Sequence, residues 1–280
     1  MVYRDYWALS QWYAHYSRHL GGNNLFVIAH GADPMVQAIC PEASVITIPR
    51  DTFTGFDRVR GRLLNSIQDG LGEAYDWVIR TDADELICLD PALHAGFREF
   101  FDKQTSRALF ALGLNVAEAG ETELAENEMA LTSRSTAIIS GHYSKAWAVR
   151  DRIALMRHGV QVKPKLVQRF DFCMPSGVYL AHLKYANLAA LTQANEHRHE
   201  VAAGTEKGLP GKAWKEPEKE AARFFAEIAA LPELDWDEAS SKAYAELSKD
   251  PVRDTENGLV RVRSKRFGDR VTLPDWFKNC

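Results

Sequence analysis

The sequence predicts an α/β protein with a mostly parallel sheet flanked by helices. Short apolar runs alternate with helix-like segments over the first 190 residues, and polar side chains follow these runs at their carboxyl ends. From about residue 200 the composition changes: the linker-like stretch GTEKGLPGK precedes segments rich in strong helix formers. We therefore expect a first domain over residues 1–195, with a mainly helical C-terminal extension over residues 196–280 packed on it.

The helices are predicted from apolar residues at three- and four-residue spacing. In the first of them Tyr6, Leu9, Tyr13 and Tyr16 share one face, and Gly21-Gly22 ends it. The segment EPEKEAARFFAEIAAL has a proline early and strong helix formers after it. The expected helices span residues 5–20, 58–71, 216–231 and 240–247.

The strands are predicted from short apolar runs that end in glycine, proline or charged residues. Residues 25–29, 45–48 and 77–81 are expected to be adjacent parallel strands whose following loops open on one edge. Residues 108–114 and 136–150 indicate further strand or mixed structure, and 177–198 a strand that runs into a helix. The weak alternation over 259–273 favours a terminal hairpin.

Composition excludes several classes of protein. The 280 residues carry a net charge of -4 with a pI near 6.2, so no basic surface for nucleic acid is expected. No run of 18 apolar residues occurs, which argues against a transmembrane segment, and the first residues lack the features of a signal peptide. The cysteines Cys40, Cys88, Cys173 and Cys280 form no C-x-x-C pair, so neither disulfides nor a zinc site is expected and the reducing cytoplasm is the predicted location.

The stretch VIRTDADELICLDP places Asp82, Asp84 and Glu85 directly after an apolar run. Aspartates often cap helices, but the next helix already has a start signal at Asp90-Pro91. Three acids together fit a hard-cation site better, because carboxylate oxygens suit Mg²⁺ or Mn²⁺. Because a D-x-D pattern alone occurs often by chance, its position directly after an apolar strand is the main support for a cation site.

These residues also carry a family resemblance. YDWVIRTDADELICLDP resembles the D-x-D segment of glycosyltransferases with the GT-A fold, particularly the family-2-like group with a D-x-D-E motif. RDYWALSQWYAHYSRHLGGNNLFVIAHGADP is similar to the entry of that group, and GHYSKAWAVRDRIALMRHGVQV and LAHLKY resemble later stretches, over residues 2–190 in all. The resemblance implies a GT-A-like nucleotide-diphospho-sugar transferase that uses Mn²⁺ or Mg²⁺. Its donor would be a UDP- or GDP-sugar and its acceptor a glycan or lipid-linked sugar, with peripheral membrane association allowed.

The resemblance also implies roles for individual residues. The metal ligands would be Asp82, Asp84 and His182, and we expect the ligand atoms of Asp84 and His182 to lie within about 3–5 Å of each other. Of the alternating Arg58, Arg60 and Arg62, Arg60 is expected to point inward, since residues two apart on a helix diverge. Arg134 and Lys145 stand where the related group has basic residues, and Lys184 is expected to be a solvated lysine at the strand end, with a contact to the phosphates as the alternative. The nucleotide-binding residues would be Tyr3, Arg4, His30, Asp33, Arg60, Asp82 and Lys145.

Three features depart from the family pattern. The strand that normally precedes the first helix is nearly absent, or the chain starts upstream of Met1. The second strand ends in His30-Gly31-Ala32-Asp33 where relatives often carry an acidic residue. No acceptor-side base motif is evident; an inverting enzyme needs such a carboxylate, and the loop EAGETELAENE offers Glu118 as the candidate nearest a strand end.

Other interpretations stay open. An aspartyl-phosphate phosphatase would use Asp82 as nucleophile, although Leu86 stands where that pattern has threonine or valine. A non-catalytic sugar- or nucleotide-binding relative would keep the fold without the base. His182 alone would be an ordinary core histidine, His158 a loop residue, and the Trp7, Trp12 and Tyr16 stripe part of the core.

Overall fold

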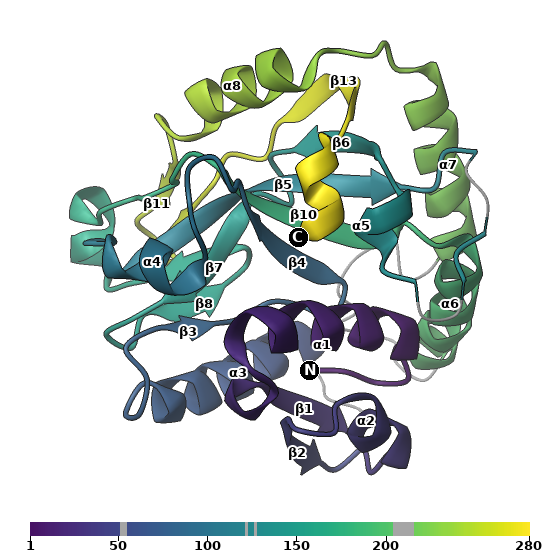
Figure 1. Cartoon of the computed structure of the whole chain (residues 1–280). Helices are drawn as coiled ribbons and strands as arrows, with labels where there is room; N and C mark the ends of the chain where they lie inside the picture. The colour runs from purple at the N-terminus through teal and green to yellow at the C-terminus, as the bar shows by residue number, and fades with distance from the viewer. Residues whose placement is uncertain (51–54, 121–122, 126–127, 204–215) are drawn as a thin grey trace.

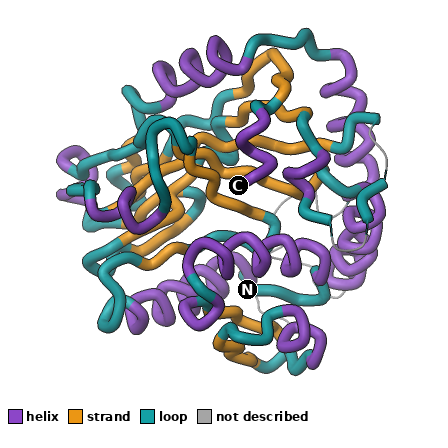
Figure 2. The backbone as a smooth tube through the Cα atoms, in the orientation of Figure 1, coloured by secondary structure: helices purple, strands orange, loops and turns teal. Residues whose placement is uncertain are grey.

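The computed structural model describes residues 1–50, 55–120, 123–125, 128–203 and 216–280. Strands occupy the centre of the molecule and helices lie around them (Figure 2). The predicted α/β class is confirmed. The predicted linker at 204–212 lies outside the described residues.

The helices follow the predicted periodicity closely. All four predicted helices are present, and the helix expected after the strand at 177–198 is present as well. The prediction that a helix starts at Asp90-Pro91 was wrong. Asp90 instead stabilises a turn, in which its Oδ1 accepts the N–H of Ala92 at 2.9 Å. The next helix begins at Phe97. The described helices are α1 (Tyr6–Leu20), α2 (Pro34–Ile39), α3 (Phe56–Leu71), α4 (Phe97–Asp102), α5 (Ala130–Ser133), α6 (Leu188–Ala203), α7 (Pro217–Ala230) and α8 (Trp236–Leu247).

The predicted parallel trio of strands is correct for two members. β1 (Phe26–His30) and β2 (Ser44–Ile48) pair in parallel. The third, β3 (Val78–Ile79), instead pairs antiparallel with β7 (Lys145–Val149). An apolar run reports that a segment is buried, but it does not report which strand edge the segment meets.

The main sheet is mixed, and the prediction of a mostly parallel sheet was wrong. In its central path only β5 and β10 run parallel, while the neighbouring pairs are antiparallel. The long apolar strand β5 is buried along its whole length, and such a run occurs in parallel and mixed sheets alike. The path is β13 (Arg266–Thr272), β6 (Thr136–Ser140), β5 (Ala108–Ala117), β10 (Val178–Tyr185) and β4 (Glu85–Leu89), with β7 on β5 and β3 on β7.

The C-terminal residues contribute strands as well as helices. The predicted hairpin over 259–273 was wrong, because its two halves join different sheets: β13 extends the main sheet, whereas the first half lies in a separate antiparallel sheet. Figure 1 shows α8 and α7 along the same side as β13. The separate sheet consists of β11 (Val252–Asp254), β12 (Leu259–Arg261), β9 (Gly159–Gln161) and β8 (Ala154–Met156).

A disulfide joins Cys88 on β4 to Cys280, so the expectation of no disulfide was wrong. Their Cα atoms lie 5.6 Å apart although 192 residues separate them in sequence. The spacing of the cysteines along the chain did not indicate this proximity. It arises because the short 3₁₀ turn Asp275–Asn279 places Cys280 beside β4. The bond ties this end of the chain to the strand that opens with Glu85.

Helix α1 fixes both ends of the acidic segment. The Trp12 indole N–H donates to Thr81 Oγ1 at 2.9 Å. One turn later the Tyr16 hydroxyl donates to the carbonyl of Glu85 at 3.2 Å and accepts the N–H of Ile87 at 3.0 Å. Tyr16 is buried, and Trp12 and Trp7 pack against the same core, which confirms the predicted core stripe. The stripe therefore also positions the residues between Thr81 and Ile87.

His15, on the same helix, makes the stability of the fold depend on pH. Its Nε2 donates to the carbonyl of Ile87 at 3.0 Å, and burial, helped by His19, lowers its pKa from 6.5 to about 3. Below pH 6.5 the unfolded chain takes up a proton that the folded chain resists, so stability is present above 6.5 and falls as pH decreases. We expect His15 to cost about 1.4 kcal/mol of stability at pH 5.5 relative to pH 7.5.

Urea unfolding of the parent chain and of His15→Gln at these two pH values measures the effect. Glutamine keeps a donor for Ile87 but does not titrate, so the variant should lose less stability on acidification. Equal losses in the two proteins would exclude His15 as the cause.

Candidate metal centre

A row of three polar residues crosses the main sheet at one level. Glu85 on β4 is the register partner of His182 on β10, and His182 is the register partner of Asn115 on β5. All three are buried. The sheet therefore brings together side chains that are distant in sequence, and β10 between its two neighbours fixes the order of the row.

Asp84, Glu85 and His182 offer ligand atoms that all lie within 4.8 Å of one another. His182 Nε2 is 3.3 Å from Asp84 Oδ2. The predicted proximity of Asp84 and His182 is thus confirmed. Two carboxylates and an imidazole nitrogen are a donor set that suits Mn²⁺ or Mg²⁺ better than a soft metal.

The hydrogen bond of His182 to Asn115 orients its ring for a ligand role. Nδ1 lies 2.8 Å from Asn115 Oδ1, and because an amide oxygen accepts, Nδ1 carries the proton. In the neutral tautomer that this bond selects, the lone pair of Nε2 lies on the side of Asp84 and Glu85. Metal-binding histidines are held in this way, with the other ring nitrogen donating to a fixed acceptor. A cation between these groups would relieve the repulsion between the lone pair and the carboxylates.

Tyr143 stacks on one face of the His182 ring. The two rings stack with centroids 4.0 Å apart and an angle of 22° between their planes. Gly113 in β5 allows this approach, since a Cβ there would lie 2.3 Å from the backbone of Tyr143. The Gly113 N–H also donates to Ser144 Oγ at 2.9 Å, which holds the turn against the strand.

Buried Lys145 and half-buried Arg60 balance the acids beside the trio. Lys145 Nζ lies 2.6 Å from Glu85 Oε2 and 3.4 Å from Asp82 Oδ2, and Arg60 pairs with Asp82. Burial alone would raise the pKa of Asp82, but Arg60 and then Lys145 outweigh it and hold that pKa well below its usual value. Burial lowers the pKa of Lys145, and Glu85 with Asp82 reverses this to a net rise.

The net charge of the groups at this site favours the binding of a cation. Three carboxylates, Asp82, Asp84 and Glu85, face the two cations Arg60 and Lys145. Among these five groups the acids outnumber the bases by one while His182 is neutral. Burial is the main cause that raises the pKa of Glu85, with Lys145 opposing it. A divalent ion would therefore bind in a region whose own charge favours it.

The individual predictions at this site can now be placed. Arg60 points inward as expected and meets Asp82, and Lys145 meets the same carboxylate. Asp82 was expected to be a metal ligand, but its carboxylate contacts these two cations, and the clustered donor atoms of the described residues come from Asp84, Glu85 and His182. Glu85 was noticed in the motif but not assigned as a ligand.

Tyr3 and His30, predicted for the nucleotide, form a second group with Arg50. The Arg50 guanidinium lies 3.8 Å from the Tyr3 ring centroid, and its Nη1 is 2.9 Å from His30 Nδ1. Arg4 lies farther from the same ring, at 5.3 Å. The sequence did not single out Arg50, which follows Pro49 just after β2. This group at the carboxyl end of β1 combines an aromatic face with a guanidinium.

Asp33 has a structural task instead. Its Oδ1 accepts the N–H of Met35 at 3.0 Å and so caps α2, and its Oδ2 accepts the Tyr6 hydroxyl at 2.7 Å. An N-cap aspartate followed by proline is a common helix start. A nucleotide that binds Asp33 would have to compete with these two hydrogen bonds for the carboxylate oxygens.

Three other candidates contact groups away from the trio. Glu118 lies 3.0 Å from Arg134 and accepts the N–H of Leu188. Lys184 bonds Glu220 on α7 at 2.6 Å and its side chain is only 12% exposed, so the expected solvated lysine at the strand end was wrong. His158 lies in the turn between β8 and β9, as predicted, but it is partly buried, and its Nδ1 lies 2.7 Å from the carbonyl of His142. Glu121 and Glu126 of the predicted base loop lie outside the described residues.

The geometry thus defines a class of site: a candidate divalent-cation centre with two adjacent cations able to contact an anion. Comparison with family models, curated proteins and solved structures gave no match. In the part of the chain that the structure describes, no helix is both long and apolar enough to cross a membrane.

Proposed function

We propose that this protein is a metal-dependent glycosyltransferase that moves a sugar from a nucleoside-diphosphate donor to a glycan or lipid-linked acceptor. The observation that supports it most is the trio Asp84, Glu85 and His182 beside buried Lys145 and half-buried Arg60. A nucleotide sugar needs both parts: a divalent cation and protein cations for its two phosphates.

Each residue group has a role in this proposal. Asp84 and His182 hold Mn²⁺ or Mg²⁺, with Glu85 next to them. Such an ion supplies Lewis-acid neutralisation of the charge that develops on a leaving diphosphate. Lys145 and Arg60 orient the phosphates, and Asp82 keeps both cations in place before the donor binds. Tyr3 and Arg50 offer a stacking face for the nucleoside, with His30 beside them.

One observation favours a second candidate, a non-catalytic nucleotide or sugar binder. Glu118, the predicted base, is paired with buried Arg134 and bonded to the start of α6. These two contacts occupy the carboxylate that an inverting reaction would need within reach of the incoming hydroxyl. A retaining reaction would not need this base. The phosphatase alternative requires Asp82 as a free nucleophile, and its two cationic partners reduce its nucleophilicity.

Titration calorimetry with UDP and with GDP, each with and without Mn²⁺, tests the proposal. We expect nucleotide binding that requires Mn²⁺, together with slow release of sugar from at least one UDP- or GDP-sugar in the absence of acceptor. Metal-dependent binding without any hydrolysis would identify the inert binder. Hydrolysis of p-nitrophenyl phosphate without nucleotide binding would identify the phosphatase.

The proposal also includes the cellular location of the protein. A nucleotide-sugar donor and a lipid-linked acceptor that meet at the cytoplasmic face of a membrane favour a cytoplasmic protein with peripheral membrane association, whereas the Cys88–Cys280 disulfide is of a kind rare in a reducing cytoplasm. Cell fractionation that finds the protein only in an extracytoplasmic fraction would contradict this location.

A further inference from the structure

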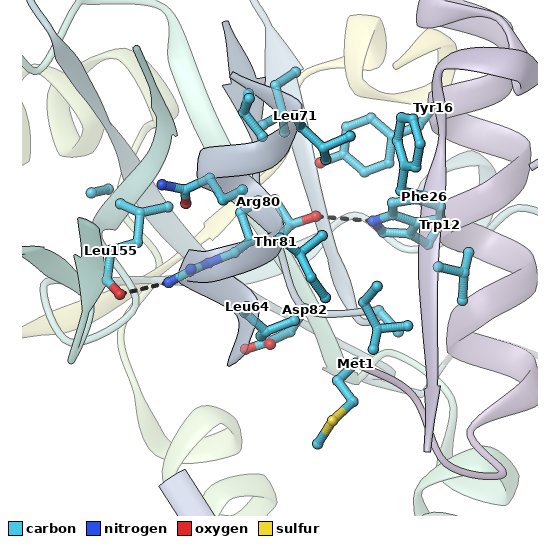
Figure 3. A pocket seen from close by; sticks show the side chains of 18 of the residues that line it. Met1, Trp12, Tyr16, Phe26, Leu64, Leu71, Arg80, Thr81, Asp82 and Leu155 are labelled. Carbon is cyan, nitrogen blue, oxygen red and sulfur yellow. Dashed lines mark hydrogen bonds between the residues drawn. The ribbon is translucent and has the colours of Figure 1, made fainter. Parts of the chain in front are cut away.

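The cleft beside Asp82 holds three side chains with a carboxylate or an imidazole group: Asp82, Asp57 and His158 (Figure 3). Asp82 already pairs with Arg60 and Lys145. Asp57 is an exposed residue in the first turn of α3. His158 is the one of the three that is partly buried without a cation bonded to it. An inverting transfer needs a proton acceptor in this cleft, so the surroundings of His158 are decisive.

The hairpin of β8 and β9, which carries His158, is bonded to both strands beside the cleft. Arg80, two residues before Asp82, donates from its guanidinium to the carbonyl of Leu155 on β8 at 2.7 Å (Figure 3). At the tip of the hairpin the carbonyl of His158 accepts the N–H of Ala146 on β7 at 3.2 Å. These bonds hold the tip of the hairpin beside the end of β3 and the start of β7.

The tip of this hairpin has an unusual backbone for its residues. It consists of Arg157 and His158, whose φ angles are 48° and 64°. A two-residue hairpin turn with positive φ at both positions favours Asn and Gly, because bulkier side chains adopt this conformation less readily. Such residues persist where the surrounding structure holds them, and they are frequent at functional sites. An imidazole at a position that glycine would occupy more easily indicates a task for the ring.

The ring of His158 is held in one orientation and one tautomer. Its Nδ1 lies 2.7 Å from the carbonyl oxygen of His142, and because a carbonyl only accepts, Nδ1 carries the proton. In the part of the chain that the structure describes, this is the one hydrogen bond of the ring, so Nε2 keeps its lone pair. The rings of His142 and Tyr143 pack beside it, with centroids 4.9 Å and 6.3 Å away. A hydrogen bond at one ring nitrogen is the usual way in which a histidine base is oriented.

The charges around His158 keep its ring neutral at physiological pH. Burial, and after it Lys145, lower the pKa of His158 from 6.5 to about 4, whereas the hydrogen bond to His142 and the charge of Asp82 act in the opposite direction. A diphosphate bound to Lys145 would offset part of that positive charge. The ring would then accept a proton more readily once the donor is in place.

We propose that His158 is the catalytic base of the transfer, an assignment that rests on the proposed function. Nε2 accepts the proton of the acceptor hydroxyl while the hydroxyl oxygen forms its bond to C1 of the donor sugar. The bond between C1 and the phosphate oxygen breaks, and the leaving diphosphate keeps its electron pair. The imidazolium then returns the proton to solvent. A displacement assisted in this way inverts the configuration at C1.

His158→Gly tests the assignment, because glycine suits the left-handed turn and leaves space for an added base. The probes are UDP-glucose and GDP-mannose with Mn²⁺, and water serves as the acceptor. We expect the variant to hydrolyse the probe that the parent chain cleaves about a hundredfold more slowly or worse. Mn²⁺-dependent binding of UDP or GDP should stay the same. Added imidazole should restore part of the lost rate in the variant and leave the parent unchanged.

Two more variants separate the lost base from a disturbed turn. His158→Asn also suits the turn and keeps a side-chain donor for the His142 carbonyl, but its amide cannot serve as a base, so it should be as slow as His158→Gly. His94→Gly is the matched control: the His94 ring also contacts a backbone carbonyl, that of Ser176 at 2.9 Å, and it does not line the cleft. This control should hydrolyse the probe at the parent rate.

The anomeric configuration of the released sugar gives an independent readout by NMR, and inversion is expected. Retention of configuration, an unchanged rate in His158→Gly, a lack of rescue by imidazole, or loss of nucleotide affinity together with the rate would each overturn the assignment and leave the proposed function intact. The same holds if Asp57→Asn, and not His158→Gly, abolishes hydrolysis. A parent chain that binds neither UDP nor GDP with Mn²⁺ and cleaves neither probe would instead overturn the proposed function, and the assignment with it.

Discussion

Asp84→Asn is expected to weaken Mn²⁺ binding by more than about a hundredfold and to abolish metal-dependent nucleotide binding, with almost no change in Tm. The change keeps the shape of the side chain but removes the charge that faces His182 Nε2. The backbone carbonyl of Asp84 still accepts the N–H of Leu183 at 2.7 Å, so the local fold stays. Calorimetry with Mn²⁺ alone and then with Mn²⁺ and UDP or GDP measures both affinities.

Asp90→Ala is the matched control. Asp90 is also an acid near the strand β4, but its carboxylate holds a turn through the Ala92 N–H. We expect this variant to lose about 1 kcal/mol of stability and to keep its Mn²⁺ affinity. If Asp84→Asn instead loses stability and binds Mn²⁺ and nucleotide as before, the aspartate is structural and the metal centre is refuted.

The sequence predicted individual helices and strands better than it predicted which distant segments contact each other. The periodicity of α1 and the strong helix formers of α7 were recognisable because each depends on neighbouring residues, and the parallel pair β1 and β2 was recognisable because the two strands follow each other closely along the chain. The antiparallel pairing of β3 with β7 was not recognisable, since burial leaves strand direction open. The disulfide from Cys88 to Cys280 was missed for a related reason: 192 residues of chain separate the two thiols.

The same division applies to the candidate site. The acids of the D-x-D-E motif and His182 were predicted because their residue types are unusual at strand ends. Asn115 was missed, although a lone amide within the apolar run ALFALGLNVA was a usable signal for a buried hydrogen-bonding role. Tyr143 and Arg50 gave no such signal, since their roles depend on turns that pack against distant strands.

Lys145→Met should have opposite effects on metal and nucleotide. Lys145 is the cation closest to buried Glu85, at 2.6 Å, and it also approaches Asp82. Without it the two carboxylates lose a positive partner, so the free energy of unfolding should fall by about 3–5 kcal/mol. The extra negative charge should strengthen Mn²⁺ binding severalfold, whereas UDP or GDP binding should weaken about tenfold or more because a phosphate contact is lost.

Two further variants separate charge balance from packing. Glu85→Gln combined with Lys145→Met removes both charges of the buried pair, so the double variant should recover much of the lost stability. Lys184→Met breaks the more exposed pair with Glu220 on α7, far along the chain from the acidic motif. It should lower stability without changing either affinity. If Lys145→Met leaves nucleotide affinity unchanged while Mn²⁺ binding strengthens, Lys145 only balances the buried acids, and the phosphates of the donor must be held by other residues.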